Sequence, residues 1–415
     1  MRFGIKTLDD YEWEGKTVLC RVDFNQPVDR KTGHLKSNAR IKACLPTIRE
    51  LQQKGAKLVL MAHQGSDIEY HNFYTTEPHS RELETLLGSP VQFVPDVWGP
   101  AAQERIRELK EGEVLLLDNV RFVSEEQTLF EMNLKLTHEQ QAQTLLVRKL
   151  APLGDLYVCD AFAAAHRDQP SLCGFEEVLP SAMGRLFERE YCVISQLMEA
   201  PRHPSTFVLG GAKVSDAFLM METVLRSGAA DKVITGGLVA NILLASQGVE
   251  IGASSMAFIL KSSCEAYIEK ICPVYAAYRD KIILPEDVAY VKDGVRYEVA
   301  VGEIPAEVGV VDIGAQTAKR YGEIIRESKT VFVNGPMGVF EEDASALGTE
   351  QVWKALGETE GYTVLGGGDS ITATKKYDLM DTISYICTGG GALIRFLSGE
   401  ELPVVRALRD AAKRG

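Results

Sequence analysis

Short hydrophobic runs alternate with helical patterns along the whole chain. In the first half the runs are TVLCRVDF, KLVLMAHQ, VLLLDNVRF and LYVCDAF. Between the first two runs, apolar residues of segment 41–48 repeat at helical spacing, with Asn38 as a candidate cap and Gly55 as the stop. The period therefore changes from two to 3.6, as in a βα unit, and its repetition predicts a parallel sheet.

The same alternation starts again after about Thr206. Its runs are TFVLGG, KVITGG, KIILPEDV, TVFVNGP, YTVLGGG and ISYICTGGG. Between the halves, segment 183–202 carries one apolar stripe after Pro180-Ser181, and Pro201 and Pro204 end it. We therefore predict an α/β fold with two doubly wound, Rossmann-like parallel-sheet domains, joined by a long helix and separated by a cleft.

The predicted boundaries follow from these patterns. They place an N-terminal domain at 1–182, a linking helix at 183–202 and a C-terminal domain at 203–399. Segment 400–415 reads as one more amphipathic helix, too short to be stable alone, so it must dock on one of the halves. A length of 415 residues also exceeds what one hydrophobic core usually serves.

Composition and charge narrow the class of partner. The net charge of −13 argues against nucleic acid or an anionic membrane, since both require broad cationic surfaces. The eight cysteines are scattered and mostly lie in apolar runs, so we interpret them as reduced core thiols. No apolar leader or bilayer-length segment is present, and we expect a cytoplasmic monomer.

In parallel sheets, ligands bind beyond the carboxyl ends of the strands. In the first half these positions carry charged or hydrogen-bonding side chains. They are Arg21, Asp23, Asn25, His63, Arg121, His166 and Arg167. So many cationic groups in an acidic protein predict a pocket for a small, multiply anionic ligand. We interpret Arg121 and Arg167 as ligand contacts and Arg21 as a surface ion pair, whereas His63 alone leaves both interpretations open.

In the second half the strand ends are rich in glycine. They comprise Gly210-Gly211 followed by Lys213, Gly236-Gly237, Asn334-Gly335-Pro336, Gly366 to Gly368 followed by Asp369-Ser370, and Gly389 to Gly391. Glycine lets backbone N–H groups approach phosphate oxygens, so this half predicts a nucleotide site built mostly from backbone. Neither the GxxxxGK[ST] P-loop nor a GxGxxG after the first strand of either half is present.

This division between an anion pocket and a nucleotide site suggests phosphoryl transfer. That reaction needs in-line positioning and neutralisation of charge rather than covalent help. Lys213 follows its strand at a position suited to this task, while Asp369 could either cap a helix or hold Mg²⁺ beside the nucleotide phosphates. No general base stands out, and a carboxylate acceptor needs none because it is already ionised.

The same segments closely resemble the phosphoglycerate kinase family, most of all its archaeal-type branch. They are RVDFNQP, AHQ, DNVRF, DAFAAAHR, GGAKVSD, NGPMGVFE, GGGDS and TGGGA, in the order of the family and over nearly the whole chain. The resemblance implies reversible phosphoryl transfer between ATP and the carboxylate of 3-phosphoglycerate in glycolysis or gluconeogenesis, with Mg²⁺ and hinge closure. It also implies that helix 400–415 packs onto the first half.

The resemblance assigns roles to individual residues. The implied acceptor-binding residues are Asp23, Asn25, Arg40, His63, Arg121 and Arg167. The nucleotide-binding set, from resemblance and strand ends together, is Gly210, Gly211, Lys213, Gly236, Gly237, Gly314, Asn334, Pro336, Glu341, Gly367, Gly368, Asp369 and Ser370, with Asp369 on the metal. The residues assigned to catalysis are Arg40, Lys213, Gly368 and Gly391.

The chain departs from the family pattern at two places. After His63 the family usually has Arg-Pro, which grips the non-transferring phosphate, whereas this chain has Gly65, Ser66 and Asp67. Ala217 also replaces a lysine found in many members. Two alternatives therefore stay open: a paralogous kinase that forms an acyl phosphate on another small acid, and a nucleotide-binding scaffold on a degenerate kinase fold.

Overall fold

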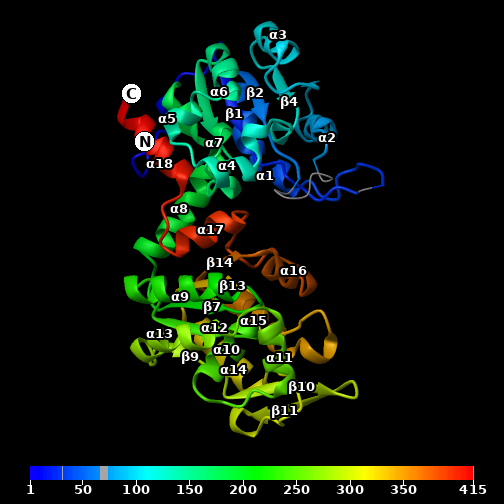
Figure 1. The fold of residues 1–415 in the computed structure, drawn as a ribbon, viewed down its shortest axis with the longest axis vertical. Helices are drawn as coiled ribbons and strands as arrows, with labels where there is room; N and C mark the ends of the chain where they lie inside the picture. Colours follow the sequence, from blue (N-terminus) through cyan, green and yellow to red (C-terminus); the bar gives the residue numbers. More distant parts are fainter. Residues whose placement is uncertain (30, 66–72, 415) are drawn as a thin grey trace. The chain divides into compact units, whose positions relative to one another are not determined.

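The chain folds into two compact units (Figure 1). The computed structural model describes residues 1–29, 31–65 and 73–414. Unit 1 comprises Met1–Cys192 with Glu401–Gly415, and unit 2 comprises Val193–Glu400. The boundary falls within helix α8 (Arg185–Glu199).

Unit 1 is built on a six-stranded parallel sheet in the order β3-β4-β2-β1-β5-β6. The strands are β1 (Thr17–Arg21), β2 (Lys57–Met61), β3 (Val91–Val94), β4 (Val114–Leu117), β5 (Leu156–Cys159) and β6 (Ser181–Met183). Side chains of the central strands are buried on both faces, which explains their nearly continuous aliphatic sequences. The four predicted runs of this half are thus confirmed as strands.

Helices follow the strands of unit 1 and enclose its core. They are α1 (Ala39–Gln53), α2 (Glu77–Leu87), α3 (Pro100–Glu108), α4 (Thr128–Leu134), α5 (His138–Gln141), α6 (Leu145–Leu150) and α7 (Pro170–Cys173). The apolar stripe of α1 is buried as predicted, and Gly55 just beyond its end has a φ of +77°. Asn38 occupies the N-cap position, but its amide donates to Glu82 Oε1 (2.8 Å) instead of capping the helix.

Unit 2 contains a second six-stranded parallel sheet, in the order β15-β14-β13-β7-β8-β9. Its strands are β7 (Ser205–Leu209), β8 (Lys232–Thr235), β9 (Ile282–Ile283), β13 (Thr330–Asn334), β14 (Tyr362–Gly366) and β15 (Tyr385–Ile386). The helices of this unit are α9 (Val214–Ser227), α10 (Gly237–Ser246), α11 (Ala253–Lys261), α12 (Ala266–Lys270), α13 (Cys272–Ala277), α14 (Ala315–Glu327), α15 (Leu347–Glu358), α16 (Gly368–Lys376) and α17 (Gly390–Leu397). The prediction of two parallel α/β sheets is therefore confirmed.

Unit 2 also has a small antiparallel sheet that the sequence analysis missed. It consists of β10 (Asp287–Lys292), β11 (Val295–Ala300) and β12 (Asp312–Ile313), in the order β11-β10-β12. The turn between β10 and β11 is Asp293-Gly294, and both residues have positive φ. An Asp-Gly pair between two β-rich runs is the strongest local signal of a hairpin, so this element could have been predicted.

The segment before the linking helix differs from the prediction. Residues 181–183 form the edge strand β6, and α8 begins at Arg185 rather than at 183. The Met183 amide donates to the carbonyl of Lys6 (3.0 Å), so the segment is held in extended form by the N-terminal residues. Gly184 separates this strand from the helix.

The C-terminal helix α18 (Pro403–Arg414) packs against β6 and α7 of unit 1. Its buried residues are Val404, Val405, Ala407 and Leu408. Arg409 donates to the carbonyl of Phe3 (3.2 Å), which links the two ends of the chain (Figure 1).

All eight cysteines belong to the described residues and are free thiols, and six of them are buried. Among the described helices, none is long and apolar enough to cross a membrane.

Candidate functional site

The carboxyl ends of neighbouring strands bring the cationic side chains of unit 1 together. The strands β4, β2, β1 and β5 lie side by side, so the segments that follow them meet at one edge of the sheet. Arg21 at the end of β1 donates from Nη2 to His63 Nδ1 (3.1 Å), two residues beyond β2. His63 is thereby fixed at this edge.

His63 is buried in a strongly positive environment. Only 4% of its surface is exposed. Burial lowers its pKa well below the usual 6.5, and four nearby guanidinium groups lower it further. In decreasing order of effect, these groups belong to Arg121, Arg21, Arg167 and Arg40. The imidazole is therefore neutral at physiological pH, and the net charge of the cluster comes from the arginines.

The segment after β1 carries the acidic and amide members of the predicted set. Asp23 is buried and forms an ion pair with Nη1 of Arg40, whose side chain is 39% exposed. The Asp23 carboxylate also accepts a hydrogen bond from the backbone amide of Asn25 (3.0 Å). The side-chain oxygen Oδ1 of Asn25 in turn accepts one from the backbone amide of Gly65 (3.0 Å). These bonds tie the segments after β1 and β2 to each other.

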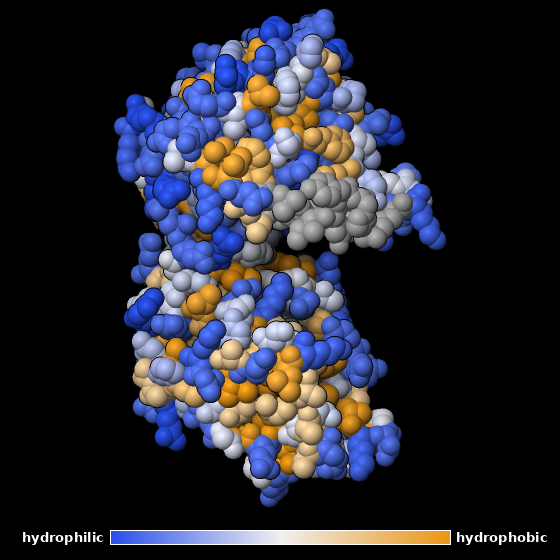
Figure 2. Space-filling view, viewed as in Figure 1, coloured by the Kyte–Doolittle hydropathy of each residue, from blue (hydrophilic) through white to orange (hydrophobic). Residues whose placement is uncertain are grey.

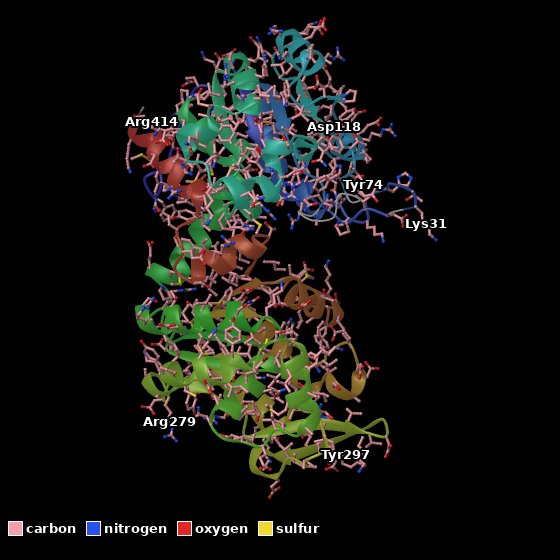
Figure 3. All side chains as sticks on the ribbon, in the orientation of Figure 1. Lys31, Tyr74, Asp118, Arg279, Tyr297 and Arg414 are labelled. Atoms are coloured by element: carbon pink, nitrogen blue, oxygen red, sulfur yellow. The ribbon has the colours of Figure 1, made fainter. Side chains whose placement is uncertain are left out.

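Asn119, two residues beyond β4, holds the segment after β2 in place. Its side-chain amide donates to the carbonyls of Gln64 (2.8 Å) and Tyr74 (2.9 Å), and its Oδ1 accepts from the amides of Gln64 and Arg121. The neighbouring Asp118 accepts from the Thr75 hydroxyl (2.9 Å); Tyr74 and Asp118 are labelled in Figure 3. Asn119 was not predicted as a site residue, although it belongs to the DNVRF motif.

Arg121 is the most enclosed of the predicted acceptor-binding arginines. It is 2% exposed, and its Nη1 donates to the carbonyl of Gly65. Gly65 is the first residue of the segment that departs from the family pattern, and its backbone carbonyl binds Arg121. Ser66 and Asp67 lie outside the described residues.

The interpretation of Arg21 as a surface ion pair is wrong. The residue is 1% exposed, because β1 is a central strand with helices on both faces. Its Nε donates to Ser171 Oγ (2.8 Å), and Ser171 in turn donates to Glu126 (2.7 Å). Ser171 and Glu126 were not predicted, since neither follows a strand and only the fold brings them to Arg21.

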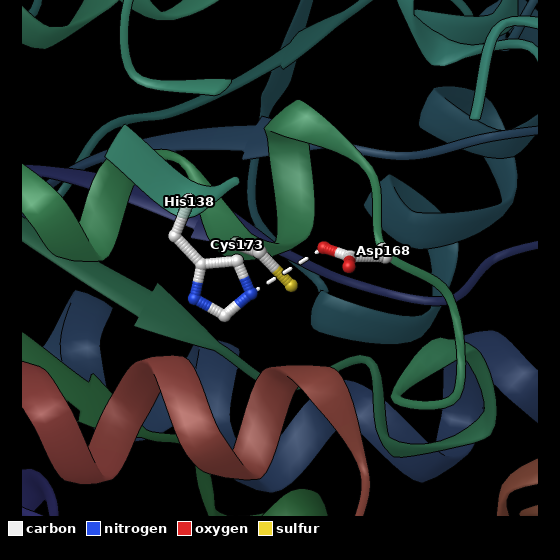
Figure 4. A group of neighbouring side chains, drawn as sticks. All are labelled: His138, Asp168 and Cys173. Carbon is white, nitrogen blue, oxygen red and sulfur yellow. Dashed lines mark ion pairs between the residues drawn. The ribbon is translucent and has the colours of Figure 1, made fainter. Parts of the chain in front are cut away.

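A His–Asp–Cys group lies next to Arg167 (Figure 4). His138 Nε2 is 3.4 Å from Asp168 Oδ1, and Cys173 Sγ contacts the carbonyl of Arg167 (3.8 Å). These are metal-ligand atom types, but Nη2 of Arg406 in α18 already lies 3.4 Å from His138 Nε2. We therefore interpret the group as a polar network that joins α18 to the segment of Arg167.

In unit 2, several predicted glycines pack backbone against backbone. The amide of Gly210 donates to Asn334, and that of Gly211 to Pro336 (2.9 and 2.8 Å). The amides of Gly236 and Gly237 donate to Leu209 and Met337 (3.1 and 2.7 Å). A Cβ at Gly210 would lie 2.1 Å from the Pro336 carbonyl oxygen. Because these four N–H groups are already used, they cannot also donate to a phosphate.

The glycine-rich strand ends border a groove of about 430 Å³ within unit 2. Of the predicted nucleotide-binding residues, those that line it are Gly211, Gly237, Pro336, Glu341 and Asp369. Sequence reasoning missed its apolar wall, which includes Leu238, Phe258, Val311, Met337 and Phe340. Phe258 of α11 is 51% exposed, and Figure 2 shows hydrophobic side chains on this face of unit 2. An apolar groove with a few polar groups is typical of a small-molecule binding site.

The other predicted residues of unit 2 lie on neighbouring elements. Lys213 is exposed at the N-terminus of α9, directly after Ala212 of the groove. Gly367, Gly368 and Ser370 form the start of α16, where Ser370 Oγ accepts from the Gly335 amide (2.7 Å). Nothing approaches within 4 Å of a Cβ built at Gly368, which leaves this helix terminus open.

Gly314 and Gly391 also lie outside the lining of the groove. Gly314 precedes α14, and a Cβ there would meet the carboxyl group of Asp287 at 2.2 Å. Gly391 lies in the first turn of α17. Ala217, the second departure from the family pattern, is 1% exposed in α9.

Comparisons with known proteins agree on one family. Residues 8–400 match the model of the family described as phosphoglycerate kinase. A phosphoglycerate kinase of Methanothermobacter thermautotrophicus is 46% identical over 99% of this chain and 98% of its own, and one of Thermococcus kodakarensis is 41% identical over 98% of both.

Solved structures give the same result. A phosphoglycerate kinase from Pyrococcus horikoshii superposes with a TM-score of 0.88 at 40% identity, covering 99% of this chain and all of the other. One from Coxiella burnetii superposes with a TM-score of 0.83 at 28% identity, covering 98% and 100%. The similarity extends over both units.

Proposed function

Because the chain belongs to the phosphoglycerate kinase family, we propose that it transfers a phosphoryl group reversibly between ATP and the carboxylate of 3-phosphoglycerate. The observation that carries this proposal is the cluster of arginines around a neutral His63, in a protein whose net charge is −13. Such a concentration of fixed positive charge is suited to an acceptor that bears both a carboxylate and a phosphate.

The acceptor is proposed to bind to unit 1. Its residues would be Asp23, Asn25, Arg40, His63, Arg121 and Arg167, as predicted. Arg40 is partly exposed and is held by Asp23, so its guanidinium can reach a bound ligand without losing its orientation. Arg121 is held by the Gly65 carbonyl, and it supplies positive charge where the family's usual Arg-Pro is missing.

The nucleotide is proposed to bind to unit 2, with its base against the apolar wall of the groove. Lys213 at the start of α9 and the open N-terminus of α16 would face the phosphates, since helix N-termini and cations both favour anions. The residues also fit Mg²⁺. Asp369 is exposed on the groove, and no hydrogen bond or ion pair occupies its carboxylate among the described residues.

Mg²⁺ prefers one or two carboxylates together with substrate phosphates, and it would neutralise charge on the nucleotide.

In the proposed reaction, a carboxylate oxygen of the acceptor attacks the γ-phosphorus, and the bond from that phosphorus to the ADP oxygen breaks. The acceptor is already ionised, so no proton has to be removed. This agrees with a site in which His63 is neutral and hydrogen-bonded. Because the two ligands must meet in line, we propose that hinge closure accompanies the reaction.

We also propose the partners and the location of the enzyme. ATP or ADP and a small anionic acid are its proposed partners, and the cytoplasm is its proposed location, as for the glycolytic role of the family. A monomeric state stays a prediction from the sequence.

The sharpest test is an acid screen with a chemical trap. The purified protein is incubated with ATP, Mg²⁺ and hydroxylamine, which converts acyl phosphates into hydroxamates, in the presence of single carboxylic acids. We expect hydroxamate from 3-phosphoglycerate and only background from the other acids. Product from another acid alone would establish the paralogous kinase instead. Nucleotide binding without product from any acid would favour the scaffold.

A further inference from the structure

A continuous chain of hydrogen bonds leads from a buried glutamate to His63. Glu126 is fully buried, and its two carboxylate oxygens accept from the amide (2.6 Å) and the hydroxyl (2.7 Å) of Ser171. Ser171 Oγ accepts from Arg21 Nε (2.8 Å), and Arg21 Nη2 donates to His63 Nδ1 (3.1 Å). The four residues come from four separate segments of unit 1.

The direction of every bond in this chain is fixed by chemistry. A guanidinium group can only donate, so Ser171 Oγ and His63 Nδ1 must both be acceptors toward Arg21. The serine hydroxyl hydrogen is then free for Glu126. A neutral imidazole whose Nδ1 accepts carries its hydrogen on Nε2. Arg21 thus defines which nitrogen of His63 is protonated, while Ser171 and Glu126 hold the Arg21 guanidinium in the position from which it donates.

The surroundings of His63 oppose protonation of the ring. Four guanidinium groups from separate elements act on it: Arg21 ends β1, Arg40 lies in the first turn of α1, and Arg121 and Arg167 follow β4 and β5. The negative groups nearby are already engaged, since Asp23 is paired with Arg40 and Glu126 is bonded to Ser171. Burial raises the pKa of Glu126, whereas Arg21, Ser171 and Arg121 oppose this rise.

We infer that Glu126 and Ser171 are positioning residues, which act through Arg21 to present His63 to the acceptor as a neutral Nε2–H donor. The hydrogen-bond assignment stands on the geometry alone, whereas its effect on the acceptor rests on the proposed function. His63 then contributes a directed hydrogen bond, and the arginines contribute the charge. A cationic imidazole would instead add to the repulsion among the four guanidinium groups.

Two substitutions interrupt the chain at different points. Ser171→Ala removes the hydroxyl that joins Glu126 to Arg21. Glu126→Gln keeps one acceptor oxygen but replaces the other with an NH₂ group, which only donates. Only one of the two hydrogen bonds from Ser171 can therefore be retained. Ser181→Ala is the matched control, because Ser181 is also buried in unit 1 and its hydroxyl donates only to the Leu179 carbonyl (2.8 Å) among the contacts described.

The spectroscopic test uses protein labelled with ¹⁵N-histidine, with the His63 signals assigned from a His63→Gln variant. Long-range ¹H–¹⁵N correlation spectra distinguish the two neutral tautomers and the charged ring. We expect wild type and Ser181→Ala to show a neutral His63 with hydrogen on Nε2 from pH 5.5 to 8. Ser171→Ala and Glu126→Gln should show a mixture of tautomers or a charged fraction at the lower pH.

The kinetic test separates positioning from general damage to the fold. Both chain-breaking variants should raise KM for 3-phosphoglycerate about tenfold, and KM for ATP should stay within twofold. A charged or Nδ1-protonated His63 in wild type would overturn the inference, even if neither variant folds. Unchanged His63 signals in both variants would also overturn it. If the predicted spectra appear but 3-phosphoglycerate is not a substrate, the proposed function fails and the hydrogen-bond chain stands.

Discussion

Lys213 combines an exposed ammonium group with a fixed backbone position. It occupies the N-cap position of α9, and the amides of the preceding glycines donate to the end of β13 and to the segment that follows it. A side chain placed in this way can respond to charge that develops during transfer. Because Lys213 belongs to unit 2, we expect other residues to bind the acceptor. Its role is therefore expected to appear in turnover rather than in acceptor affinity.

Substitution of Lys213 by alanine tests that role. Lys213→Ala should lower kcat by a factor of about 10² to 10³, which is typical for loss of one group that stabilises the transition state. KM for 3-phosphoglycerate should change less than threefold. Lys319→Ala, at an exposed site in α14, is the control and should leave both constants unchanged. Equal losses in kcat and acceptor affinity would contradict the assignment.

At the scale of residues, position relative to the strands was informative. His63, Arg121 and Arg167 were singled out because they follow buried runs, and the structure brings them to one edge of a sheet. Arg21 satisfied the same rule but is a buried link to Ser171. The partners of a buried side chain depend on contacts distant in sequence, so Ser171 could not have been predicted from spacing.

At the scale of elements, Asp160 is coupled to the start of α8. Its Oδ1 accepts from the amides of Leu186 (2.9 Å) and Phe187 (3.1 Å), which are first-turn donors of this helix. Asp160 is fully buried, and burial raises its pKa from 3.8 to about 7. The linking helix therefore begins at a carboxyl group that titrates near neutral pH.

This coupling predicts a particular pH dependence. Because the folded pKa is raised, Asp160 contributes stability that is complete below pH 3.8 and is lost as the pH rises through about 7. The free energy of unfolding of wild type relative to Asp160→Asn should thus fall between pH 5 and pH 8, by on the order of 3 kcal/mol at most. Urea unfolding of both proteins at the two pH values measures the difference, and other titrating groups cancel. A difference independent of pH would show that Asp160 is ionised throughout.

The docking of α18 gives a second test at this scale. Leu408 is fully buried against unit 1, so Leu408→Ala should destabilise the fold by about 2–4 kcal/mol through lost packing and a residual cavity. Lys413→Ala on the exposed side of the same helix should change stability by less than about 0.5 kcal/mol. Urea unfolding followed by tryptophan fluorescence checks both. Equal effects of the two substitutions would mean that α18 is not held by its apolar face.

Elements with strong periodicity were predictable, and short elements were not. The aliphatic runs of β1, β2, β4 and β5 are typical of buried strands. The three residues of β6 follow Pro180, which resembles a helix start, and their extended form depends on the Lys6 carbonyl. The Asp293-Gly294 turn, by contrast, is a local signal in the sequence that indicates the β10–β11 hairpin.

At the scale of the whole molecule, the sequence and the structure divide the chemistry in the same way. Unit 1 supplies charged side chains, and unit 2 supplies a groove with an apolar wall and glycine-rich ends. The sequence indicated this division because the residues that follow the predicted strands are charged or polar in the first half and glycine-rich in the second. It did not indicate that the amides of Gly210, Gly211, Gly236 and Gly237 are used internally, since their bonds form only once β7, β8 and β13 are aligned.

The central claim is that the cationic edge of unit 1 recognises the phosphate end of the acceptor even without the family's usual Arg-Pro. Comparison of kcat/KM for 3-phosphoglycerate and for glycerate, at saturating MgATP, tests it most directly. Several charge-assisted hydrogen bonds to the phosphate predict a preference for 3-phosphoglycerate of at least about 10²-fold. Equal efficiency with the two acids, within about threefold, would contradict the account.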